Sequence, residues 1–136
     1  MVKVTDGDTI TILTADNEQE RIRLWGIDAP EKRGGQPYWK ASRDQLASMV
    51  AGKQVTVTWD KRDRYGRIIG WVLVDEGMWV NKVMVLTGMA WWFERYAPDD
   101  DSLKEAQETA KEKKLGLWGE PMAVAPWDWR QGVRKL

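Results

Sequence analysis

The sequence predicts an α+β fold, mainly a β barrel, with five strands and three helices. Strand-like segments at residues 2–5, 9–14, 21–27, 54–59 and 67–74 are short. Most of them alternate apolar with polar side chains, which is the period-two pattern of half-buried strands. A helix-like segment separates the third strand from the fourth. Five strands with a helix inserted after the third favour a small Greek-key barrel of the oligonucleotide/oligosaccharide-binding (OB) type.

Turn residues join the first three strands into an antiparallel meander. Asp6-Gly7-Asp8 forms the first turn, because glycine accepts the backbone angles of a sharp bend. Residues 15–20 are polar and form the second connection, a hairpin. A loop with two prolines follows the third strand at residues 28–37.

Three helices complete the predicted domain, and Gly52 and Gly88 are suitable stop signals for the first two. Their expected ranges are residues 38–51, 80–87 and 102–114. No internal repeat or long linker divides the chain. We therefore expect one domain at residues 1–119, with an extended C-terminal arm at 120–136 that packs on the same domain.

Composition excludes several kinds of catalysis. The 136 residues contain no Cys and no His, so thiol nucleophiles, Cys or His zinc sites and Ser–His pairs are impossible. Proton transfer must use Asp, Glu, Tyr, Lys or a metal-bound water. A metal held by side chains would have mainly oxygen ligands, which favours Ca²⁺, Mg²⁺ or Mn²⁺. Because 21 basic residues balance 21 acidic ones, affinity for nucleic acid must come from a local basic groove.

The sequence gives little information about cellular location and oligomeric state. No apolar run approaches the roughly 18 residues of a membrane span, and no signal peptide precedes the first strand. The absence of Cys fits an exported bacterial protein. We expect a secreted or periplasmic mature domain whose leader is absent, with the cytoplasm as the alternative, and a monomer without membrane contact.

Carboxylates at two strand ends are candidate metal ligands. Asp8 follows the first turn, and Asp28 ends the third strand in I-D-A-P-E. Taken singly, each is an ordinary turn or loop acid. Two carboxylates from different strands, with a loop carbonyl such as that of Ala29, would leave room for water and a phosphate oxygen around Ca²⁺. Glu31, three residues after Asp28, is placed to act on a water beside that ion.

Arginines accompany these acids. Arg23 lies on the third strand and Arg67 begins the fifth. The ordinary interpretation of each is a surface ion pair, which is worth little. A guanidinium can also clamp phosphate through two N–H groups, which Lys cannot do. Two arginines and a divalent cation together could stabilise the negative charge of a pentacovalent phosphorane.

Aromatic side chains have two expected uses. Tyr65 and Tyr96 lie near basic residues, and an exposed Tyr can stack on a nucleobase. The chain also has ten Trp. Since burial is the commonest use of such rings, we expect one group of them to fill the core and plug the barrel. That group is Trp71, Trp79, Trp91 and Trp92.

Four motifs occur in order along the chain: D-G-D-T, R-x-R-L-x-G-I-D-A-P-E, D-R-Y-G-R-x-x-G and V-N-x-x-M-V-x-x-G-x-A-W. Together they resemble the staphylococcal nuclease (thermonuclease) family over residues 4–119. The P-W-D-W-R of the arm is similar to the end of bacterial members. The resemblance implies a nuclease with an OB-type barrel that uses one Ca²⁺ ion, cleaves DNA and RNA, and leaves 3′-phosphate ends.

The resemblance also implies a metal site. Asp8 and Asp28 would bind Ca²⁺ together with the Ala29 carbonyl, and Asp6 would be an acid close to the metal. Family members commonly have Thr at the position of Ala29, but the backbone carbonyl is unaffected by this difference. Glu94 stands where the type member has a nucleotide-contacting tyrosine, which would alter base stacking.

The remaining matches are three catalytic and three substrate-binding residues. The implied catalytic residues are the phosphate-binding Arg23 and Arg67, and Glu31 as general base or water positioner. The implied substrate-binding residues are Arg64 and Tyr65, which hold a terminal phosphate, and Tyr96, which packs near the base.

The favoured function is therefore a calcium-dependent nuclease, a hydrolase acting on phosphodiester bonds. The first alternative is an OB barrel that binds nucleic acid or a protein motif without cutting, as catalytically inactive relatives do. The presence of both metal acids, both arginines and Glu31 favours the enzyme. The second alternative, an oligosaccharide-binding barrel, rests on the Trp count, and the basic turn D-R-Y-G-R counts against it. The preference for DNA or RNA, and for endo- or exonuclease action, stays open.

Overall fold

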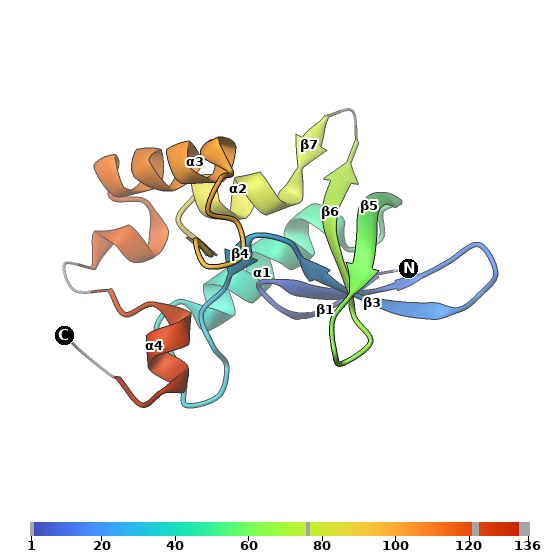
Figure 1. Cartoon of the computed structure of the whole chain (residues 1–136), viewed down its shortest axis with the longest axis horizontal. Helices are drawn as coiled ribbons and strands as arrows, with labels where there is room; N and C mark the ends of the chain where they lie inside the picture. Colours follow the sequence, from blue (N-terminus) through green and yellow to red (C-terminus); the bar gives the residue numbers. More distant parts are fainter. Residues whose placement is uncertain (1, 76, 121–122, 134–136) are drawn as a thin grey trace.

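The computed structural model describes residues 2–75, 77–120 and 123–133. A twisted sheet lies at one end of the molecule and most of the helices gather beside it (Figure 1). The strands of this sheet are, in spatial order, β1 (Val2–Asp6), β2 (Thr9–Leu13), β3 (Gln19–Leu24), β6 (Ile68–Val74) and β5 (Val55–Arg62). A short strand, β7 (Met78–Trp79), pairs with β6.

Strand pairing confirms the predicted α+β class and meander. β1 pairs with β2 and β2 with β3, both antiparallel. β3 and β6 are parallel, with Leu24 opposite Gly70, so the β5–β6 hairpin lies beside the end of β3. Among the described residues no hydrogen-bonded pairing joins β1 to β5, so these five strands have an open order.

The predicted third strand at residues 21–27 is wrong in one respect, because it is two strands. β3 ends at Leu24, and β4 (Ile27–Asp28) pairs instead with β8 (Trp91–Trp92). The break falls at Gly26, whose φ of +77° suits glycine. A Cβ atom there would lie 2.7 Å from the Leu103 side chain. This break carries Asp28 out of the main sheet.

Helices follow the expected ranges, with one addition. α1 (Trp39–Val50), α2 (Val80–Leu86) and α3 (Asp101–Glu112) correspond to the three predicted helices. A short 3₁₀ helix (Gly116–Gly119) leads into the arm, where α4 (Pro126–Arg130) lies within the segment expected to be extended. Pro126 begins α4 and its fixed φ suits that position. None of the helices described here is long and apolar enough to cross a bilayer.

The core lies between the sheet and the helices. Its fully buried side chains include Ile10, Ile22, Leu24, Ile27, Leu46, Val72, Val74, Met84, Val85 and Leu103. Burial along β6 alternates, so Val72 and Val74 face inward and Trp71 faces outward. Of the Trp residues expected in the core, Trp92 is buried, whereas Trp79 is 38% exposed. The expectation for Trp79 is wrong because β7 is a two-residue strand at the sheet edge, paired with the end of β6, where the Trp79 ring is left partly open to solvent.

Candidate active site

The turn between β1 and β2 holds two carboxylates in a tightly packed position. A Cβ atom on Gly7 would lie 1.8 Å from Ser42 Oγ and 2.8 Å from Ala29 Cβ, so only glycine fits there. Asp6 Oδ1 accepts a hydrogen bond from the Asp8 N–H (3.0 Å). Asp8 is buried, and its carboxylate accepts from Thr9 Oγ1 (3.0 Å) and from the Ala29 N–H (2.9 Å). The Asp8 side chain is thereby fixed toward the loop that follows β4.

Arg23 lies between the two predicted metal ligands. It projects from β3, and its Nη2 is 3.5 Å from Asp8 Oδ2 and 3.6 Å from Asp28 Oδ1. Its Nη1 donates to the Leu24 carbonyl (2.8 Å). Asp28, on β4, is only 1% exposed. The structure therefore brings Asp6, Asp8, Asp28 and Arg23 together, although they come from different strands.

Burial of these acids shifts their pKa values. Burial, and then the neighbouring Asp8 charge, raise the pKa of Asp6 to about 8. Burial raises the pKa of Asp28 to about 6, against the opposing effect of Arg130. Burial alone would also raise the pKa of Asp8, but Arg23 and the hydrogen bonds that Asp8 accepts lower it below its usual value. Burial and mutual repulsion thus oppose the ionisation of Asp6 and Asp28 beside Asp8, and a bound cation would favour the ionised form of all three acids.

The donor atoms fit a hard divalent ion in part. Asp8 and Asp28 provide carboxylate oxygens from two strands, and Asp6 lies beside them. Over the described ranges, no three Asp or Glu side chains are arranged to hold an ion by themselves. A Ca²⁺ ion here would therefore need backbone carbonyl, water or phosphate oxygens as further ligands, which its coordination habits allow.

Glu31 lies at the start of the loop after β4, and its backbone is held in place. Its N–H donates to Gln36 Oε1 (2.8 Å). Gln36 is buried and its Nε2 donates to the Val124 carbonyl (2.7 Å). Trp129 Nε1 donates to the Arg33 carbonyl (3.0 Å). The loop that carries the predicted water-handling acid is thus attached to the C-terminal arm at two points.

Arg130 is the residue that sequence reasoning missed. It ends α4, and its guanidinium donates to Asp28 Oδ2 (2.6 Å) and Oδ1 (3.2 Å). It also binds the Glu31 carboxylate. These carboxylates are 102 and 99 residues away in sequence, so no local pattern links them. The one available signal was that P-W-D-W-R places an arginine at the end of a short aromatic segment.

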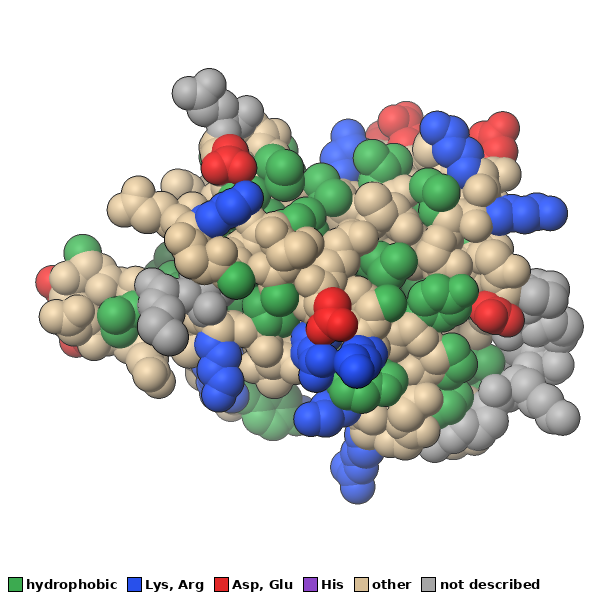
Figure 2. Space-filling view, turned by 180° about the vertical axis from the view of Figure 1, so that it is seen from behind, with side chains coloured by type: hydrophobic (Ala, Val, Ile, Leu, Met, Phe, Trp, Pro, Cys, Tyr) green, Lys and Arg blue, Asp and Glu red, His purple; other side chains and the backbone are tan. Residues whose placement is uncertain are grey.

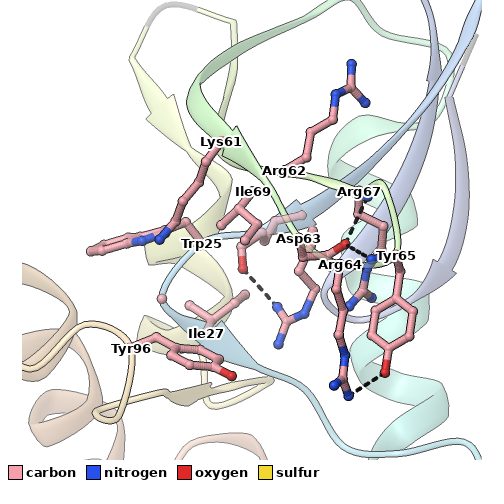
Figure 3. A pocket seen from close by; sticks show the side chains of 13 residues that line it. Trp25, Ile27, Lys61, Arg62, Asp63, Arg64, Tyr65, Arg67, Ile69 and Tyr96 are labelled. Atoms are coloured by element: carbon pink, nitrogen blue, oxygen red, sulfur yellow. Dashed lines mark hydrogen bonds and ion pairs between the residues drawn. The ribbon is translucent and has the colours of Figure 1, made fainter.

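A pocket of about 570 Å³ opens beside this acid cluster. Figure 3 shows Arg64, Tyr65 and Arg67 on one side of it, with Trp25 and Tyr96 across from them. Its lining also includes Arg23, Lys61, Arg62 and Asp63. Tyr65 and Tyr96 are 58% and 67% exposed, so their rings are accessible to a ligand. Of the predicted residues, Arg23, Arg64, Tyr65, Arg67 and Tyr96 line the pocket, whereas Asp8, Asp28 and Glu31 do not.

The β5–β6 hairpin arranges the cations of this pocket. Arg67 Nε donates to Asp63 Oδ2 (2.7 Å), and Arg64 Nη2 donates to Tyr65 Oη (2.8 Å) (Figure 3). The Arg64 and Arg67 guanidinium carbons lie 4.9 Å and 5.5 Å from the Tyr65 ring centre. On the face seen in Figure 2, several basic side chains gather around a carboxylate. The chain has zero net charge, yet it concentrates positive charge locally.

Comparison with known proteins finds a nuclease family and nuclease-named relatives. Residues 21–120 match the family described as staphylococcal nuclease homologue. An "Uncharacterized endonuclease" of Escherichia coli is 48% identical over 96% of this chain and 82% of that protein. A "Micrococcal nuclease" of Shigella flexneri is 37% identical over 98% of this chain and 80% of that protein. The "Staphylococcal-like nuclease CAN1" of Arabidopsis thaliana is 40% identical over 84% of this chain but only 34% of its own length.

The fold, the acid cluster and the cationic pocket define a nuclease, a hydrolase that acts on phosphodiester bonds of nucleic acids. The chain belongs to the staphylococcal nuclease family, since the family match covers most of its length.

Proposed function

We propose that this nuclease is calcium-dependent, hydrolyses both DNA and RNA, and leaves 3′-phosphate ends. The observation that supports this most strongly is the position of Arg23. Its guanidinium lies within 3.6 Å of both Asp8 and Asp28 and also lines the cationic pocket. A phosphodiester bound in the pocket would therefore lie next to the acid cluster.

The arginines bind the phosphate and stabilise its charge during the reaction. Arg23 is held between two carboxylates, so its orientation is set before substrate arrives. Arg67 is bound by Asp63 through Nε, and a guanidinium bound in this way can still present its two Nη groups to a phosphate. Arg64 and Tyr65 would hold a terminal phosphate on the same hairpin, and Tyr96 would pack against a base.

Glu31 positions the water and accepts its proton. The water oxygen forms a bond to phosphorus, the bond from phosphorus to the 5′ oxygen breaks, and that oxygen takes a proton from solvent. Glu31 is partly exposed and its backbone is fixed by Gln36, which suits a group that must meet both water and substrate. Arg130 binds Glu31, so Glu31 must loosen this contact to act on water.

Asp8, Asp28 and the Ala29 carbonyl would hold the Ca²⁺ ion, with Asp6 as the acid beside it. When bound, the ion would polarise the phosphate and neutralise part of its charge. We also propose that the protein works as a monomer in the periplasm or outside the cell, with the cytoplasm as the alternative location.

A direct assay tests the proposal. Purified protein is incubated with DNA and with RNA, in Ca²⁺, in Mg²⁺ and in EGTA, and the product ends are identified by phosphatase treatment and mass spectrometry. We expect cleavage of both polymers in Ca²⁺, no cleavage in EGTA, and 3′-phosphate ends. Unchanged cleavage in EGTA would exclude the calcium requirement, and 5′-phosphate products would exclude the direction of attack.

A further inference from the structure

Four tryptophans lie on a surface that starts in the pocket lining and extends beyond it, which we call the aromatic track: Trp25, Trp59, Trp71 and Trp79. The Trp25 and Trp71 ring centres are 5.4 Å apart, and those of Trp71 and Trp79 are 5.9 Å apart. Trp59 and Trp79 are 47% and 38% exposed. Large aromatic rings left open to water next to one another are uncommon without a ligand or partner.

The aromatic track begins at the catalytic pocket and leads away from it. A second hollow of about 320 Å³ shares Trp25 and Ile69 with the pocket and is also lined by Trp59 and Trp71. A third hollow of about 330 Å³ shares Trp71 with the second and ends between Trp79 and Lys82. The three hollows therefore follow one another along the outer face of β6.

The backbone under the aromatic track is rigid. Asn81 is fully buried, and its side-chain amide donates to the carbonyls of Trp25 (2.9 Å) and Gly70 (3.1 Å). Its Oδ1 accepts from the N–H of Val72 (3.0 Å), the residue after Trp71. The Trp25 N–H also donates to the Gly70 carbonyl (2.8 Å). A surface fixed in this way loses little conformational freedom when a ligand binds.

Charge and position indicate the ligand. The Arg62 guanidinium lies 5.2 Å from the Trp59 ring centre, Lys61 lines the pocket end and Lys82 the far end. Asp60 is the one acid in the lining of the second and third hollows. Aromatic rings accompanied by cations are the means by which proteins bind single-stranded nucleic acid, with bases on the rings and phosphates beside the cations. Bases in a duplex are already stacked on one another and cannot use such rings.

We propose that the aromatic track binds the unpaired nucleotides of the substrate that extend beyond the scissile phosphate. This inference rests on the nuclease function and deepens it, because it specifies single-stranded substrate over a length greater than the pocket can hold. Lys61 and Lys82 follow the phosphates at either end, while Trp59 and Trp79 present rings to successive bases.

The test compares substrates of different length for Trp59→Ala, Trp79→Ala and the double variant. The substrates are a dinucleotide, a single strand of about 12 nucleotides, within the roughly 4–16 that one OB barrel covers, and a duplex of the same length. Loss of one stacked base weakens binding by about five-fold or more. We expect each single variant to raise the KM for the single strand by about that factor, with kcat/KM for the dinucleotide and the duplex unchanged within about two-fold.

Leu13→Ala is the matched control, because Leu13 is 43% exposed and lies at the end of β2, in the other hairpin. It should leave all three substrates unaffected. Equal losses on dinucleotide and single strand, or no loss on the single strand, would overturn the proposal. Sedimentation gives another outcome that would overturn the proposal. If wild type is a dimer and the Trp variants are monomers, the surface binds a second copy of the chain and not nucleic acid.

Anisotropy of the labelled single strand in EDTA separates this proposal from the nuclease function. If the wild-type protein cleaves no substrate, this result refutes the proposed activity and leaves the aromatic track to be tested by binding. The aromatic track is supported if the double variant then still binds the strand at least five-fold more weakly than wild type, and is refuted if both bind equally.

Discussion

Replacing Arg130 with Ala is the change that most directly tests how charge is balanced at the site. Arg130 makes two hydrogen bonds to Asp28, of 2.6 and 3.2 Å, and also binds Glu31. Asp28 is 1% exposed while Arg130 covers it, and water that enters the space left by the arginine would replace the lost guanidinium only in part. Arg23 remains 3.6 Å away as the other cation near this carboxylate.

The magnitude follows from this geometry. Removing one partner of a fully buried ion pair costs about 3–5 kcal/mol. The Arg130 side chain is 40% exposed, and Arg23 still compensates part of the charge. We therefore expect a loss of about 1–3 kcal/mol of unfolding free energy. In a chain of 136 residues this lowers Tm by about 4–10 °C.

Thermal unfolding in EDTA measures this loss, with Arg43→Ala as the control, since Arg43 forms a surface ion pair with Asp44 and lies over the Trp39 ring, away from the acid cluster. The control should change Tm by less than about 2 °C. Ca²⁺ should then raise the Tm of the Arg130→Ala protein more than that of wild type, because the ion would no longer compete with Arg130 for Asp28. An Arg130→Ala protein as stable as the control, with the same calcium shift as wild type, would refute this account.

Four further substitutions test separate parts of the site. Arg23→Ala and Glu31→Gln should each lower kcat by about 10²–10³-fold with an unchanged circular dichroism spectrum; near-normal kcat in either would remove that residue from the mechanism. Gly7→Ala should cost about 1–3 kcal/mol, because its Cβ would meet Ser42 Oγ at 1.8 Å, and adding Ser42→Ala should recover part of the loss; no recovery would contradict the steric explanation. Burial raises the folded-state pKa of Asp6 from 3.8 to about 8. Protonated Asp6 therefore makes its full contribution to the free energy of unfolding below about pH 4, and this contribution is lost as pH rises through 8. Asp6→Asn cannot lose that proton, and its stability in EDTA relative to wild type should increase from pH 5 to pH 9; a constant difference would show that Asp6 has an ordinary pKa.

Local sequence pattern predicted most of the fold and half of the site. The three-stranded meander and the three long helices follow from alternation, helical spacing and glycine stop signals. Asp6 and Asp8 at the β1–β2 turn and Asp28 on β4 were recognisable because each lies at or directly beside a strand end. Arg23 and Arg67 both line the pocket because β3 and β6 pair in the sheet, and the sequence pattern did not specify this pairing.

Long-range contacts could not be predicted in the same way. The role of Arg130 depends on how the arm packs, through Gln36 to Val124 and Trp129 to Arg33. Nothing in the five residues of α4 specifies that partner surface. The exposure of Trp79 could not be predicted either, because the burial of a Trp on an edge strand depends on which side of that strand it faces. The break at Gly26 depends on contact with Leu103, 77 residues later.

In the proposed mechanism, Arg23 joins a metal-binding acid cluster to a phosphate-binding pocket. Calcium titration of wild-type and Asp28→Asn proteins by calorimetry, with cleavage of single-stranded DNA followed in the same samples, tests this link. We expect one Ca²⁺ site in wild type, activity that rises as this site fills, and loss of both in Asp28→Asn. Full cleavage without Ca²⁺ binding, or unchanged binding and cleavage in Asp28→Asn, would contradict it.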